Sequence, residues 1–110
     1  MLGLMQKQEL LISSLIEFAQ RHHGEGEIVS RRVEGDIHRY TWKDVAARSR
    51  QVANALDAMK LGFSDRVATL AWNGYRHLEL YFGVSGSGRV LHTLNPRPHP
   101  VQTSWIADPA

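Results

Sequence analysis

The feature of this sequence that most limits its fold is a pair of short apolar runs on either side of a helical pattern. The runs are RVATLAW, residues 66–72, and VLHTL, residues 90–94. Nearly continuous apolar runs of this length are typical of strands in a parallel sheet that is covered on both faces. Between them, residues 75–86 have apolar side chains at helical spacing. The three segments predict a strand–helix–strand unit with a right-handed crossover, and therefore an α/β fold.

A helix and a hairpin are predicted ahead of this unit. Residues 10–21 place Leu11, Leu15 and Phe18 on one helical face, and no small-residue cleavage site follows, so we predict an amphipathic helix and not a signal peptide. We expect it to pack against a core, with a position on a membrane surface as the alternative. The runs EIVSRRV and IHRYTW, joined by Glu34, Gly35 and Asp36, predict a β-hairpin.

A second helix is predicted to begin after Thr41. The Thr41 hydroxyl and the Asp44 carboxylate have the spacing of a capping box, and Gly62 is placed to end the helix in a left-handed conformation. The expected apolar stripe of this helix consists of Val45, Val52, Leu56 and Met59.

Length and composition restrict the classes of protein that remain. A chain of 110 residues with 43% hydrophobic and 22% charged residues is typical of one soluble domain. The net charge of +2 comes from interspersed signs, which argues against a nucleic-acid partner. The absence of cysteine excludes disulfides and thiolate chemistry and agrees with a cytoplasmic location.

The stretch GVSGSGRV, residues 83–90, does not fit a phosphate-binding loop. A dinucleotide fingerprint is G-x-G-x-x-G between a strand and a helix N-terminus, whereas here the order is G-x-x-G-x-G after a helix and before a strand. We interpret these glycines as a helix end that turns into a strand.

Other candidate sites are weak. The six histidines are scattered or adjacent, which is not the spacing of a metal site. Ser85, Ser87 and His92 do not form the G-x-S-x-G elbow of a hydrolase. Trp42, Trp72 and Trp105 each have apolar neighbours and are expected to pack in or beside the core.

Several phrases, taken in order, resemble the adenylate-forming enzymes. RYTWKDV resembles an early signature of that superfamily, and DRVATLAWN, RHLELYF and HTLNPR are most similar to fatty-acyl-CoA synthetases of the medium- to long-chain kind. The resemblance extends over residues 10–107. It implies the N-terminal part of the large AMP-binding domain, with an incomplete sheet.

The resemblance also implies a two-step ligase that uses ATP, magnesium and coenzyme A. The family places catalysis in a phosphate loop ending in Pro-Lys-Gly, a Thr-Glu pair, a ribose-binding aspartate and a C-terminal lysine, and none of these motifs occurs in residues 1–110. We therefore assign no catalytic, cofactor-binding or metal-binding residue, and expect the chain to be inactive without the missing remainder of the ligase.

The chain departs from the family pattern at two places. Arg89 replaces a small residue, and the segment after Arg97 carries Pro98, Pro100, Val101 and Pro109 where a helix with an acidic start is expected, so the last dozen residues are divergent. Pro100 fits the first turn of a helix leading into residues 102–107. A truncated gene, a frameshift or a decaying copy would explain such an ending.

An incomplete sheet should expose the apolar faces of residues 66–72 and 90–94 and favour self-association through its open edge. The alternative function is a small non-catalytic binding or assembly module built from the same fold piece, and a ligase split between two chains is intermediate between these hypotheses. We expect a cytoplasmic protein, with peripheral membrane contact left open.

Overall fold

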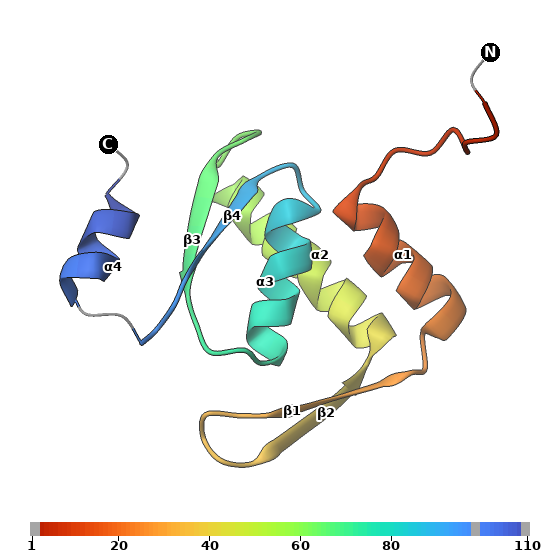
Figure 1. Cartoon of the computed structure of the whole chain (residues 1–110). Helices are drawn as coiled ribbons and strands as arrows, with labels where there is room; N and C mark the ends of the chain where they lie inside the picture. The colour runs from red at the N-terminus through yellow and green to blue at the C-terminus, as the bar shows by residue number, and fades with distance from the viewer. Residues whose placement is uncertain (1–2, 98–99, 109–110) are drawn as a thin grey trace.

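The computed structural model describes residues 3–97 and 100–108, and it has the predicted helix, hairpin, helix and strand–helix–strand order (Figure 1). The elements are α1 Ile12–His23, β1 Glu27–Arg31, β2 Ile37–Thr41, α2 Trp42–Ala58, β3 Arg66–Leu70, α3 Tyr75–Ser85, β4 Val90–Leu94 and α4 Pro100–Ala107. The α/β prediction is confirmed. Among the described residues, no helix has the length and apolar character needed to cross a bilayer.

The strands form two separate two-stranded sheets. β1 and β2 pair antiparallel from Glu27 opposite Thr41 to Arg31 opposite Ile37, and Gly35 in the connecting turn has φ 99°. β3 and β4 pair parallel, with α3 as the crossover between them. Both the hairpin and the strand–helix–strand unit are therefore confirmed.

The parallel pair exposes apolar side chains, as expected for an incomplete sheet. Burial alternates along β3, with Val67 and Thr69 less exposed than their neighbours. Leu70 is 61% exposed, and Val90 is also exposed. Strands of this type are covered on both faces in a complete parallel sheet, but here they are exposed, as expected for an incomplete one, because α2 and α3 lie to one side of the pair and the sheet has no further described strands (Figure 1).

The core lies where α1, α2, α3 and the hairpin meet. It is centred on Ile16, Val45 and Ala46, and the partly buried side chains around it are Ile28, Tyr40, Trp42, Leu78 and Phe82. Trp42 thus packs beside the core as predicted. Trp105 is 81% exposed, so the packing expectation is wrong for it: α4 lies apart from the helical core, as Figure 1 shows.

The helix ends differ from prediction by a few residues. α1 begins and ends two residues later than expected, and Leu11 is its N-cap. The capping box of Thr41 and Asp44 at α2 is confirmed. α2 ends at Ala58, and Lys60 takes the left-handed conformation with φ 61°. The prediction that Gly62 fills this role is therefore wrong.

Arg89 has a structural role in the turn before β4. Its buried guanidinium donates to the Leu61 carbonyl, to the Asp57 carboxylate at 2.5 Å and to Ser87 Oγ at 2.8 Å. These bonds hold the start of β4 against the end of α2. Pro100 is the first residue of α4, as predicted, whereas Pro98, His99 and Pro109 lie outside the described residues.

Candidate functional site

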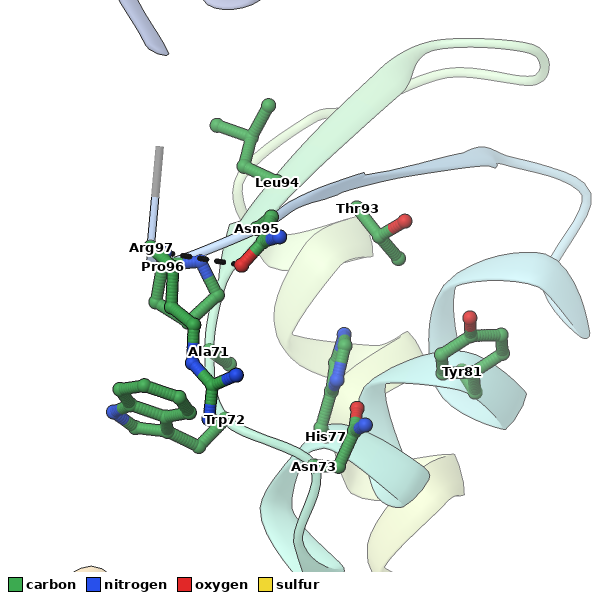
Figure 2. A pocket seen from close by; sticks show the side chains of 10 residues that line it. All are labelled: Ala71, Trp72, Asn73, His77, Tyr81, Thr93, Leu94, Asn95, Pro96 and Arg97. Atoms are coloured by element: carbon green, nitrogen blue, oxygen red, sulfur yellow. Dashed lines mark hydrogen bonds between the residues drawn. The ribbon is translucent and has the colours of Figure 1, made fainter. Parts of the chain in front are cut away.

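A pocket of about 600 Å³ opens at the carboxyl ends of the two parallel strands (Figure 2). In open α/β sheets, ligands bind in the crevice outside the carboxyl ends of the strands. The segments that follow β3 and β4 supply most of the lining, and α3 supplies two side chains. The lining residues are Ala71, Trp72, Asn73, His77, Tyr81, Thr93, Leu94, Asn95, Pro96 and Arg97.

Arg97 gives this pocket a positive charge. Its guanidinium carbon lies 5.2 Å from the centre of the Trp72 ring, and its backbone N–H donates to Asn95 Oδ1 at 3.0 Å. A guanidinium over an aromatic face is attracted by the ring quadrupole, which restricts its orientation. No carboxylate lines the pocket, and the described part of the chain contains no ion pair to Arg97. The pocket is therefore suited to an anionic group.

His77 is the buried titratable residue of the pocket. The residue is 6% exposed, and its Nε2 lies 3.1 Å from Thr69 Oγ1, a hydroxyl of the neighbouring strand. The His77 ring also meets the Tyr81 ring edge-on at 5.2 Å. In Figure 2 the imidazole points from α3 toward Thr93. The strand hydroxyl and the aromatic edge together fix the ring at the pocket wall.

The other histidines that the structure describes do not line this pocket. His22 and His23 contact Phe18 at the end of α1, and His38 stacks on Tyr75 with ring centres 3.8 Å apart. Within residues 3–97 and 100–108, no three His, Asp or Glu side chains converge as a metal ion requires. These residues therefore do not fit a resident Mg²⁺ site.

The glycine-rich stretch is a helix end, as predicted. Gly83 lies within α3, Gly86 is its C-cap, and Gly88 has φ 78° in the turn to β4. Ser87 Oγ donates to the Gly83 carbonyl at 2.6 Å. None of the described hydrogen bonds links Ser85, Ser87 and His92, so the structure contains no hydrolase triad at these residues.

A second polar cluster holds the hairpin against α2 and α3. Glu79 is buried on α3 and accepts from Arg48 Nε at 2.6 Å. Burial, and next the Glu79 charge, raise the pKa of the Tyr40 hydroxyl, while the hydrogen bond to Glu79 raises the pKa of Arg48. This cluster does not line the carboxyl-end pocket, and we interpret it as structural.

Sequence reasoning missed the pocket residues. Asn73, His77, Asn95 and Arg97 were not predicted as site residues, because no motif joins them along the chain. The signal that could have located them is positional. Asn73 follows the first predicted strand and Asn95 and Arg97 follow the second, and the carboxyl ends of parallel strands meet at one edge of a sheet.

Comparison with known proteins identifies the family. Residues 15–108 match the AMP-binding enzyme family. The chain is 48% identical over 110 residues to a medium-chain-fatty-acid–CoA ligase of Ectopseudomonas oleovorans and 50% identical over 110 residues to a 3-methylmercaptopropionyl-CoA ligase of Ruegeria pomeroyi, covering all of this chain and 20% of each relative. It is 43% identical over 106 residues to a long-chain-fatty-acid–CoA ligase of Thermus thermophilus, covering 96% of this chain and 20% of that relative.

The chain thus spans about a fifth of the length of the curated relatives that it matches. The family matches most of the chain, and relatives are about half identical to the chain along its whole length. A shared fold alone does not produce sequence identity this high. The chain belongs to the AMP-binding enzyme family.

Proposed function

We propose that this chain is the N-terminal segment of an AMP-forming fatty-acyl-CoA ligase. The observation that carries the proposal is the identity to acyl-CoA ligases along the whole chain, at 48% to the medium-chain enzyme. In the proposed reaction the fatty acid carboxylate attacks the α-phosphorus of ATP and pyrophosphate leaves. The coenzyme A thiol then attacks the acyl carbonyl carbon and AMP leaves. The products are acyl-CoA, AMP and pyrophosphate.

The proposed substrate class is a fatty acid. Two of the relatives are named for medium-chain and long-chain fatty acids, whereas another is named for 3-methylmercaptopropionate. The names of these relatives therefore support a carboxylic acid that is joined to coenzyme A. Acyl chain length is not assigned to any described residue.

The proposed role of the carboxyl-end pocket is to form part of the ligand cleft of the complete ligase. Arg97, which has no ion pair among the described residues, and the absence of a carboxylate from the described lining support an anionic ligand group. ATP, coenzyme A and the fatty acid all carry such groups.

We further propose that the chain is catalytically silent without the remainder of the ligase, which would be its partner. Magnesium and ATP are required by the family, and the described residues do not provide a metal cluster. Nothing in the comparisons favours the alternative of a separate binding module. A cytoplasmic location remains part of this proposal.

A chimera tests the proposed function. The matching N-terminal fifth of the Ectopseudomonas oleovorans ligase is replaced with this chain, and acyl-CoA formation is measured with a medium-chain fatty acid. We expect a rate within about tenfold of the parent enzyme, a loss of at most about 1.4 kcal/mol of barrier, because the two segments are 48% identical over 110 residues.

The controls are the parent ligase without its N-terminal fifth and this chain alone, both of which should form no acyl-CoA. A folded chimera that gives neither acyl-CoA nor ATP–pyrophosphate exchange would contradict the proposal. Activity of the isolated 110-residue chain would contradict the expectation that it is silent.

A further inference from the structure

We propose that His77 is held as the Nδ1–H tautomer and presents this N–H to an anionic oxygen of the ligand in the carboxyl-end pocket. The tautomer follows from the contacts of this chain alone. The ligand class, a carboxylate or phosphate oxygen, rests on the proposed function and deepens it. His77 is thus a binding and positioning residue.

The Thr69 hydroxyl determines the tautomer. Thr69 is 6% exposed, and the partner of its Oγ1 among the described residues is His77 Nε2 at 3.1 Å. A buried hydroxyl proton without an acceptor is more costly than an unused oxygen lone pair. Thr69 therefore donates its proton to Nε2, which must be unprotonated to accept it.

A neutral imidazole with an unprotonated Nε2 carries its proton on Nδ1. No hydrogen bond to Nδ1 is found within the described residues, and Nδ1 is not one of the enclosed, unpartnered side-chain atoms. The Nδ1–H group is consequently an accessible donor. No carboxylate of the pocket lining is present to accept from it.

The neighbouring charge favours an anionic acceptor. Arg97 lines the same pocket, lies over Trp72 and has no ion pair in the described part of the chain. A negatively charged ligand oxygen is attracted by the Arg97 guanidinium and accepts a hydrogen bond from the Nδ1–H donor. An uncharged ligand of the same shape loses most of the attraction to the guanidinium.

Nitrogen-15 NMR of the histidine rings tests the tautomer. The chain is labelled uniformly and long-range proton–nitrogen spectra are recorded at about pH 8, where an ordinary histidine is neutral. We expect a protonated Nδ1 and an unprotonated Nε2 at His77, and a shift toward the Nε2–H form in Thr69→Val, which removes the hydroxyl at nearly constant volume. An Nε2–H tautomer or an imidazolium in the unchanged chain would overturn the proposal.

Titration tests the ligand class. ATP, coenzyme A, octanoate and the uncharged analogue octanamide are added separately while the His77 ring and the Arg97 side chain are monitored. We expect a saturable shift of the His77 Nδ1 signal with at least one of the three anions and at least about tenfold weaker binding of octanamide than of octanoate where octanoate binds. Binding by none of the anions would overturn the assignment of the ligand.

Matched variants separate a binding role from a structural one. His77→Gln should lower the affinity for the anion about tenfold. His22→Gln, which changes an exposed histidine on α1, should leave this affinity unchanged. If His77→Gln fails to fold, Thr69→Val takes its place and should lower the affinity for the same anion about threefold. Equal affinities in the folded variants would overturn the proposal. An inactive chimera would refute the proposed ligase function while leaving the tautomer measurement valid.

Discussion

Thr41 and Asp44 show how two neighbouring side chains fix the start of a helix. The Thr41 backbone N–H donates to Asp44 Oδ2 at 2.9 Å, and the Asp44 N–H donates to Thr41 Oγ1 at 3.3 Å. The Thr41 backbone N–H, and next the Thr41 hydroxyl, which donates to Asp44 Oδ2 at 2.8 Å, lower the pKa of the Asp44 carboxyl. The sequence predicts this pair because its partners are three residues apart and need no distant contact.

The capping box should make stability depend on acidity. The Asp44 pKa is lower in the folded chain than in the unfolded one, so its contribution is present above the unfolded pKa and is lost as pH falls through the folded value. In urea unfolding from about pH 6 to about pH 3, Asp44→Asn should lose less stability than the unchanged chain. Thr41→Ala should cost about 1 kcal/mol at neutral pH.

The control for this loss of stability at low pH is Glu9→Gln, in the exposed segment ahead of α1. Its pH dependence should parallel that of the unchanged chain. If the stability of Asp44→Asn falls between about pH 6 and about pH 3 as steeply as that of the unchanged chain, the role assigned to the carboxylate is contradicted.

At the scale of elements, the crossing of α2 and α3 depends on Gly83. A Cβ at Gly83 would lie 2.6 Å from Val52 Cβ and 2.9 Å from the Ser49 carbonyl oxygen. This close approach brings the two helices together beneath the parallel strands. The glycine therefore serves packing, which agrees with its position inside a helix.

Gly83→Ala should destabilise the chain by about 2 kcal/mol, because the new methyl group overpacks the crossing. Val52→Ala keeps the Cβ that lies 2.6 Å from the new methyl group, and the Ser49 carbonyl oxygen is backbone, so the double variant should recover little of this stability. Gly62→Ala is the matched control, since the nearest atom to its Cβ would be 3.7 Å away. A neutral Gly83→Ala in thermal unfolding would contradict the close crossing.

The elements were predictable where local pattern determines them and less so where distant contacts do. The hairpin turn and the capping box arise from neighbouring residues and were predicted. The end of α2 was misplaced because Lys60 adopts a conformation that the sequence assigned to Gly62. The pocket was missed because Asn73, His77 and Arg97 come together only after β3 and β4 pair.

At the scale of the whole molecule, the parallel sheet exposes apolar side chains that a complete domain would cover. Leu70, Trp72 and Val90 are exposed on or beside β3 and β4. Exposed apolar strand surface promotes association between chains. We therefore expect the isolated chain to self-associate as its concentration rises.

Leu70→Lys should lower the association constant by at least about tenfold. Analytical ultracentrifugation over about a hundredfold range of concentration measures this constant. Leu15→Lys is the matched control, because Leu15 on α1 is 63% exposed and Leu70 is 61% exposed. An equal effect of the two substitutions would place the contact elsewhere, and a monomer at every concentration would contradict self-association.

The first turn of α3 is completed by a residue from another part of the chain. Ser30 Oγ on β1 accepts from the Tyr75 N–H at 3.0 Å, across a separation of 45 residues. This N–H has no such acceptor unless the hairpin is docked, so the docked hairpin helps to stabilise the first turn of α3. His77 lies two residues further along α3, so the hairpin also supports the helix that forms one wall of the pocket.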